Sequence, residues 1–135
     1  MLDKMGRDKM FYKICHINNS AIEDKDLVLS EMRSINNPNF QDVDGNSYLH
    51  MACQAHSIEA VELLLNMGAD PNILDNCGFP PIISAVDCID SRNGEILDAM
   101  LKNGLNLDLM INGLTLRSLI ESFGNLELIG ILDSY

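Results

Sequence analysis

Hydrophobic residues in the middle of the chain recur every three to four positions, in short stretches that end at glycine or proline. This spacing places the apolar side chains on one side of a helix. The clearest example runs from Ile58 to Met67, with Ser57 as the N-cap before it and Gly68 as the C-cap after it. A helix this short cannot bury its apolar side alone, so the pattern predicts neighbours that pack against it.

The same criteria predict helices along most of the chain. They are expected at Lys9–Ile17, Asp26–Ile35, Tyr48–Ala55 and Glu95–Lys102, in a helix that Pro81 begins, in one that carries Leu116, Leu119, Ile120 and Phe123, and in a last one after Asn125 with Leu126, Ile129 and Leu132 inward. Met110 and Ile111 fall in a predicted loop, where they either pack on the neighbouring loop or belong to a contact surface.

The order helix, turn, helix and extended loop repeats along the chain. Matching residues stand 33 positions apart, namely Asp42 and Asp75, Gly45 and Gly78, Ala52 and Ala85, and the pairs Pro38-Asn39 and Pro71-Asn72. Residues 68–72 are echoed by residues 104–108, and a third unit begins near Gly113. Helix pairs at a fixed period predict a solenoid, in which each pair buries its apolar side against the next.

The repeated unit resembles the ankyrin repeat. Ser47-Tyr48-Leu49-His50 stands where that family has Thr-Pro-Leu-His, and residues 63–72 closely match its second helix and loop. The resemblance implies an all-α ankyrin-repeat solenoid of stacked helix-turn-helix units, forming a single domain over residues 1–135. Residues 1–40 are expected to be N-terminal capping helices, 41–73 and 74–108 repeats, the second with an insertion between its helices, and 109–135 a degenerate C-terminal capping repeat.

The sequence departs from the family pattern in two ways. The second repeat has Pro80 and Ile83 where threonine and histidine are expected, and the last unit keeps only Thr115. Residues 88–94 also add about three positions between the helices of the second repeat. Insertions in surface loops cost little stability, so this one is either neutral drift or part of a specific surface.

Composition and charge narrow the range of partners. The 135 residues are 47% hydrophobic, which suits one globular domain, and they carry 9 basic and 20 acidic side chains for a net charge of −11. This excess argues against nucleic acid and anionic membranes, because both are bound through Lys and Arg. It favours a protein partner with a basic surface, although acidic charge also simply keeps a small protein soluble.

Candidate chemical sites are few. His50, Cys53 and His56 stand three apart, but a closed zinc site needs four ligands, so we expect a turn hydrogen bond for His50 and a core position for Cys53. Cys77 is expected at an exposed loop tip without a basic neighbour. Residues 42–46 lack the length and the distal glutamate of a calcium loop. The sequence therefore predicts no enzyme, no cofactor, no metal and no small-molecule substrate.

The N-terminus has no apolar leader, and no apolar run is long enough to span a bilayer, so the sequence predicts a cytoplasmic protein. In that compartment the cysteines are expected to be reduced thiols, and they are Cys15, Cys53, Cys77 and Cys88.

The resemblance implies a protein-binding module that uses its loop tips and the exposed side of each first helix. Carried over position by position, the partner-binding residues are Val43, Asp44, Asn46, Gln54, Asn76, Cys77, Phe79, Asp87, Asn112 and Leu114. Phe79 is expected to stand out from its loop as an aromatic anchor, because aromatic side chains dominate the energetics of interfaces.

Three functions follow as hypotheses. The first is a module that binds one protein partner through an acidic concave surface and inhibits or adapts it. Its sharper form is an immunity protein that neutralises a basic nuclease-like toxin. The second is an architectural subunit of a permanent complex. The third is an enzyme, which the lack of a recognisable site in the sequence disfavours.

Overall fold

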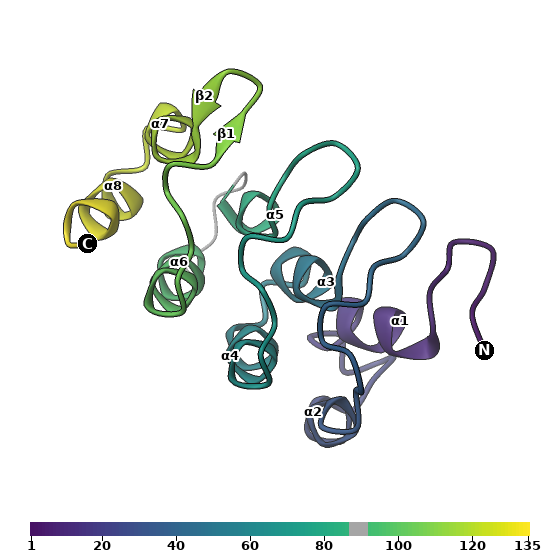
Figure 1. The fold of residues 1–135 in the computed structure, drawn as a ribbon. Coiled ribbons are helices and arrows are strands. Elements are labelled where there is room, and N and C mark those ends of the chain that lie inside the picture. Colours follow the sequence, from purple (N-terminus) through teal and green to yellow (C-terminus); the bar gives the residue numbers. More distant parts are fainter. Residues whose placement is uncertain (87–91) are drawn as a thin grey trace.

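The computed structural model describes residues 1–86 and 92–135, which form eight helices and one short hairpin. The helices come in consecutive pairs, whose first and second members form two rows (Figure 1). The elements are α1 (Lys9–Cys15), α2 (Lys25–Met32), α3 (Tyr48–Gln54), α4 (Ile58–Asn66), α5 (Ile82–Val86), α6 (Asn93–Lys102), β1 (Met110–Ile111), β2 (Leu114–Thr115), α7 (Leu116–Ser122) and α8 (Leu126–Asp133).

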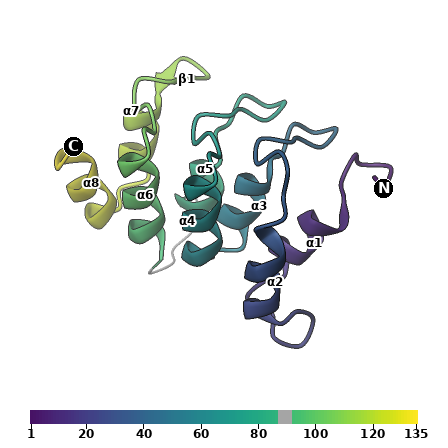
Figure 2. The same cartoon turned by 60° about the horizontal axis from the view of Figure 1, so that its bottom comes forward.

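The pairs stack on one another. Helix α3 packs against α1 on one side and α5 on the other, and α4 packs against α2 and α6. Within the pairs, α3 contacts α4, α5 contacts α6 and α7 contacts α8. The loops that join successive pairs project from one side of the stack (Figure 2). This arrangement confirms the predicted helical solenoid, whose buried side chains form one continuous core.

Side-chain caps explain where the helices begin. The Ser47 and Ser57 hydroxyl oxygens accept the backbone N–H groups of His50 and Ala60, which starts α3 and α4. Four other helices, α1, α2, α7 and α8, are capped in the same way by Asp8, Asp24, Thr115 and Asn125. Because these signals are local in sequence, the predicted helices are placed correctly, although α1 and α2 end two to three residues earlier than expected.

Of residues 88–94, where an insertion between the helices is predicted, residues 88–91 lie outside the described residues and the last two belong to α6. Asn93 and Gly94 are buried in this helix, and a Cβ atom at Gly94 would lie 2.5 Å from Oε1 of Glu127 in α8. The close packing of α6 on α8 therefore favours a longer helix than the sequence indicated.

In helix α8, Leu132 is buried as predicted, but Leu126 is not, and Leu128 is buried in its place. Leu126 is 82% exposed, whereas Leu128 and Leu132 are buried. Helices α6 and α7 pack on the side of α8 that carries these two leucines. Periodicity alone could not distinguish this side, because Leu126, Leu128 and Ile129 are all apolar.

Each projecting loop is called a finger here, and the first three fingers (residues 3–7, 42–46 and 75–79) share one turn. Oδ1 of Asp42 accepts the N–H groups of Asp44 and Asn46, both at 2.9 Å. Asp3 and Asp75 hold the same turn in the first and third fingers. In each turn the aspartate side chain thus accepts two backbone N–H groups that would otherwise lack a carbonyl acceptor.

The fourth finger (residues 110–115) is a β-hairpin instead, so the loop predicted at Met110 and Ile111 is a strand. Ile111 pairs with Leu114, and the two-residue turn between them has left-handed φ angles of 51° at Asn112 and 86° at Gly113. Ile111 is buried, whereas Met110 is 62% exposed. Ile111 therefore belongs to the core, whereas a contact role for the exposed Met110 stays a prediction.

Two asparagines 33 residues apart connect successive repeats. Asn39 Oδ1 accepts the N–H of Asp70 at 2.7 Å, and Asn72 Oδ1 accepts the N–H of Asn106 at 2.7 Å. The Asn72 amide also donates to the carbonyl of Gly104 at 3.0 Å. The repeated Pro-Asn pair therefore fixes how each connecting loop sits on the next.

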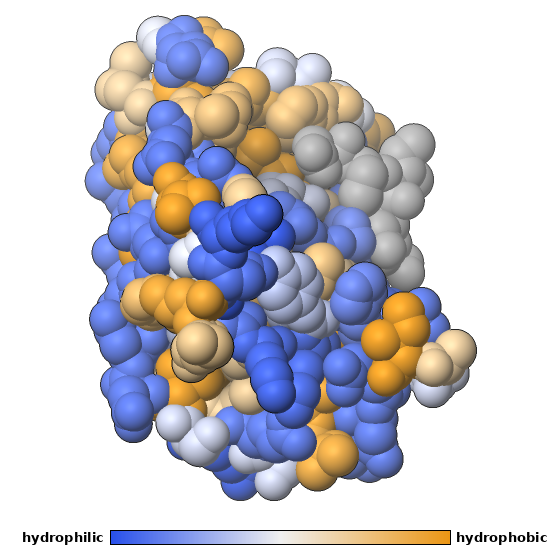
Figure 3. Space-filling view, turned by 90° about the vertical axis from the view of Figure 1, so that its right-hand side faces the viewer, coloured by the Kyte–Doolittle hydropathy of each residue, from blue (hydrophilic) through white to orange (hydrophobic). Residues whose placement is uncertain are grey.

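The two ends of the stack carry ion pairs at positions that are apolar inside it. Counted from the helix N-caps, Lys13 and Glu31 in the first pair of helices take the places of the buried Ala52 and Leu64, and they form an ion pair. Figure 3 views this end of the stack, where hydrophilic residues surround separate apolar patches. At the other end Arg117 lies 3.3 Å from Asp133.

Candidate functional site

The structure places the predicted partner-binding residues on the fingers and at the end of one first helix. Val43 and Leu114 are 55% and 47% exposed. The exposed polar members are Asp44, Gln54, Asn76, Cys77 and Asn112, and Asn46 is half-buried. Asp87 lies outside the described residues. Gln54 ends α3, away from the finger tips, so the set does not form one continuous patch.

Phe79 does not stand out as predicted. Its side chain is half-buried and packs against the core. Its backbone also holds the base of the third finger, because its N–H donates to Oδ1 of Asp75 at 3.0 Å and its carbonyl accepts the N–H of Asp75 at 3.0 Å. The sequence placed Phe79 in a loop, where it does lie, but could not show that this loop folds back onto the helices.

Backbone hydrogen bonds join the first three fingers. The N–H of Val43 donates to the carbonyl of Met5 at 2.8 Å, and the N–H of Asn76 donates to the carbonyl of Asp44 at 2.9 Å. The Asn76 amide donates to the carbonyl of Val43 at 2.7 Å. Among the described residues, no hydrogen bond joins the third finger to the fourth. The predicted contacts on the second and third fingers are therefore held together, and those on the fourth are separate.

The first finger was missed in the sequence. Arg7 forms an ion pair of 2.7 Å with the buried carboxylate of Asp42, whose hydrogen bond raises the pKa of Arg7. The Arg7 guanidinium also lies 5.8 Å from the centre of the Tyr12 ring. The signal was available, because Asp3 and Gly6 have the same spacing as the aspartate and glycine of the second finger.

His50 has the structural role that the sequence predicted. Its Nδ1 accepts the N–H of Ser47 at 3.0 Å, so its Nε2 carries the proton and donates to the carbonyl of Phe79 at 3.0 Å. Burial lowers the pKa of His50, which keeps the ring neutral. One side chain thus caps α3 and joins it to the third finger.

Cys53 has the core position that the sequence predicts for it. Cys53 is fully buried, and burial raises the pKa of its thiol, so it is no nucleophile. In residues 1–86 and 92–135, no three His, Cys, Asp or Glu side chains are placed to hold a metal ion. Of the helices in that part of the chain, none has the length and apolar character to cross a bilayer.

The second helices form one acidic side of the structure, and the acidic concave surface that the sequence predicts stays a prediction. Nine carboxylates belong to α2, α4, α6 and α8 or their N-caps, namely Asp24, Asp26, Glu31, Glu59, Glu62, Glu95, Asp98, Glu127 and Asp133. On the fingers, by contrast, Asp3, Asp42 and Asp75 hold turns. The net charge gives the excess of acidic over basic residues, but it does not show on which face of the molecule the acidic residues lie.

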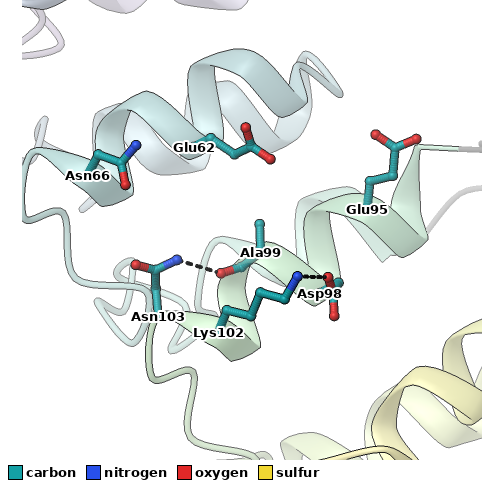
Figure 4. Close-up of a pocket in the computed structure, with 7 residues that line it drawn as sticks. All are labelled: Glu62, Asn66, Glu95, Asp98, Ala99, Lys102 and Asn103. Carbon is teal, nitrogen blue, oxygen red and sulfur yellow. Dashed lines mark hydrogen bonds and ion pairs between the residues drawn. The ribbon is translucent and has the colours of Figure 1, made fainter.

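A groove of about 330 Å³ opens on this acidic side between α4 and α6 (Figure 4). Glu62, Glu95 and Asp98 line it, together with Lys102, which lies 2.9 Å from Asp98. Hydrogen bonds from Lys102 and then Tyr135 lower the pKa of Asp98. The sequence analysis missed this groove, although Glu62 and Asp98 occupy matching positions of successive second helices.

Comparison with known proteins identifies the family. The family model for ankyrin repeats (3 copies) matches residues 17–115. The chain is 35% identical over 106 residues to the ankyrin repeat protein L92 of Acanthamoeba polyphaga mimivirus, an alignment that covers 72% of this chain and 25% of that protein. It is 28% identical over 102 residues to the nuclear factor NF-kappa-B p110 subunit of Drosophila melanogaster, covering 67% of this chain and 10% of that protein.

A third relative is ankyrin repeat domain-containing protein 63 of Mus musculus, 29% identical over 92 residues, which covers 64% of this chain and 23% of that protein. The chain therefore spans a quarter or less of the length of these relatives. Ankyrin repeats generally mediate protein–protein interaction, and no catalytic family is indicated. Because the matched residues make up well over half of the chain, the chain belongs to the ankyrin repeat family.

Proposed function

We propose that the chain is a non-enzymatic module that binds one protein partner through its fingers and the exposed side of its first helices, and so inhibits or adapts that partner. The carrying observation is the exposed surface of the second and fourth fingers, where Val43 is 55% and Leu114 is 47% exposed. Exposed apolar side chains that project from a folded scaffold are typical of contact surfaces.

The proposed partner presents apolar and amide groups to the fingers and carries a basic surface, which the charge of the second helices attracts from a distance without contacting it. The second helices carry an excess of carboxylates, and fields of this sign raise the association rate of basic partners. A basic nuclease-like toxin has such a surface, so an immunity protein remains the sharper form of the proposal.

Capture with paired variants tests which face binds. The finger variant combines Val43→Ser with Leu114→Ser, and the control combines Glu62→Gln with Glu95→Gln in the acidic groove. We expect a protein from the native cell, identified by mass spectrometry, to be retained by the wild type and the control and lost by the finger variant. Loss from the groove variant alone would overturn the proposed face. Circular dichroism checks that both variants fold.

An architectural subunit of a permanent complex is the alternative, and the 82% exposure of Leu126 favours it. An obligate complex would cover such a side chain. Sizing of the purified chain separates the two functions, because a stable soluble monomer is expected of a module that binds a partner reversibly. Aggregation that Leu126→Ser relieves would instead support the permanent complex.

A further inference from the structure

Three Asn-Gly pairs occur in the chain, at residues 93–94, 103–104 and 112–113. Such a pair is chemically labile, because glycine has no side chain to shield its backbone nitrogen from the neighbouring amide. The three pairs have the same intrinsic chemistry, so any difference between them comes from the fold. The structure places them in three different settings.

The first two pairs are restrained. Asn93 is 1% exposed within α6, and Gly94 packs against Glu127 and Ile131 of α8. At the second pair the Asn103 amide donates to the carbonyl of Ala99 at 2.8 Å. The N–H of Gly104 donates to the carbonyl of Leu101 at 3.2 Å, so the nucleophile of this pair is held in a hydrogen bond.

The third pair forms the tip of the fourth finger. Asn112 is exposed, and a Cβ atom built at Gly113 would meet nothing within 4 Å. Within residues 1–86 and 92–135, no hydrogen bond engages the Asn112 side chain or the N–H of Gly113 beyond the strands' own pairing. This finger also lacks the hydrogen bonds to a neighbouring finger that join the first three.

We propose that Asn112 is a site of spontaneous deamidation, selected by the fold over the two other Asn-Gly pairs. The Gly113 backbone nitrogen loses its proton to base and attacks Cγ of Asn112. The new C–N bond closes a succinimide ring, and the side-chain nitrogen leaves as ammonia after taking up a proton. Water then opens the ring at either carbonyl and yields aspartate or isoaspartate. Water is the only co-reactant, and no electron transfer occurs.

The products change the surface of the fourth finger. Either product adds a negative charge beside Leu114 and Met110, which are 47% and 62% exposed. Isoaspartate also adds a methylene group to the backbone of a two-residue turn, which breaks the β1–β2 register. A charge at this tip weakens contact with an apolar partner surface, and this consequence rests on the proposed function.

Peptide mapping by mass spectrometry tests the selection. The folded chain is incubated in mildly alkaline buffer, and the conversion of amide to acid is followed at each pair. We expect Asn112 to convert several-fold faster than Asn103, and Asn93 to convert slowest. Folded-state conversion of Asn103 or Asn93 as fast as that of Asn112 would overturn the proposal, as would an Asn112 that stays intact.

Incubation in concentrated urea provides the control. Unfolding removes the burial and the hydrogen bonds, so the three pairs should then convert at closely similar rates. If the order of rates were the same in the unfolded chain, flanking sequence and not the fold would set it, and the proposal would fail.

Two variants of equal charge test the consequence for binding. Asn112→Asp and Asn103→Asp each add one carboxylate, and both residues tolerate left-handed or capping backbone. We expect Asn112→Asp to lower the affinity for a captured partner several-fold and Asn103→Asp to leave it nearly unchanged. Equal affinities would refute a role for this finger in binding, whereas the mass spectra alone decide whether the site deamidates.

Discussion

The repeat built from α3 and α4 and the last unit, built from α7 and α8, share one scaffold and differ in what covers them. In the inner repeat, Leu49, Cys53 and Leu65 are buried. Counted from the N-caps, the matching residues of the last unit are Arg117, Glu121 and Asp133. Arg117 lies 3.5 Å from Glu121 and 3.3 Å from Asp133.

The difference shows that the same helix pair can lie inside the stack or at its end, and that a few side chains decide which. Burying these charges under a further repeat would cost far more than leaving them in water. The proposal that the first and last units act as caps gains support from these ion pairs. The following predictions test the contrast between the inner repeat and the last unit.

The largest effect is expected in the inner core. Leu64 is fully buried, so Leu64→Ala should lower the free energy of unfolding by about 2–5 kcal/mol. Leu126→Ala removes the same atoms from an exposed site and should change it by less than about 0.5 kcal/mol. Urea denaturation measures both. Equal losses would mean that the last unit is covered in solution.

The second prediction compares two glycines with left-handed backbones. A Cβ atom at Gly45 would lie 2.7 Å from the backbone nitrogen of Asn76, so Gly45→Ala should destabilise the chain by about 1–3 kcal/mol. Gly113→Ala carries the strain of its φ of 86° without a clash, and about 1 kcal/mol is expected. Thermal unfolding compares the two, and a milder effect at Gly45 would contradict the close approach of the second and third fingers.

The third prediction concerns pH. The pKa of His50 is lower in the folded chain than in the unfolded one, so the unfolded state binds more protons and stability falls as the pH drops through about 6.5. Protonation at Nδ1 would also break the bond from the Ser47 N–H. The hydrogen bond to the Phe79 carbonyl, and then the charges of Asp75 and Asp42, oppose this lowering of the His50 pKa.

Urea denaturation at a series of pH values checks this loss. The exposed His16 serves as the matched site, so His16→Gln should keep the loss and His50→Gln should remove it. A pH dependence unchanged in His50→Gln would assign the effect to another group. The last unit has Ser118 at the matching position and cannot contribute.

The smallest effect is expected at the ion pairs of the last unit. Arg117→Ala should lower the free energy of unfolding by no more than about 1 kcal/mol, because the pairs with Glu121 and Asp133 are partly exposed. Added salt should shrink the difference from wild type. A loss as large as that of Leu64→Ala would show that these charges are buried in solution.

The sequence predicted what depends on local signals. Ser57 and Gly68 bracket α4 as expected, because a cap acts within a few residues. The burial of Phe79 and the orientation of Leu126 depend on neighbours distant in sequence, which a single helix pattern does not contain. Asn112-Gly113 between apolar residues is a strong hairpin signal, so the fourth finger was predictable but overlooked.

The predicted contact surface also has a part that the sequence predicts and a part that depends on how distant elements pack. Val43 and Cys77 lie at exposed positions because the repeat fixes which residues reach a finger tip. Net charge alone does not locate the acidic face, and the matching positions of Glu62 and Asp98 in successive second helices were overlooked. The acidic face became visible when Glu62 and Glu95 were placed on adjacent second helices.

The hydrogen bonds from Val43 to Met5 and from Asn76 to Asp44 join three neighbouring fingers at matching positions. A partner that contacts all three fingers must therefore present its contact groups at the spacing of the fingers. The conformational entropy of ordering the fingers is lost when the chain folds, so little more of it is lost on binding. Such a surface favours a rigid partner whose contact groups match the spacing of the fingers, and it disfavours a partner whose contact groups are spaced differently.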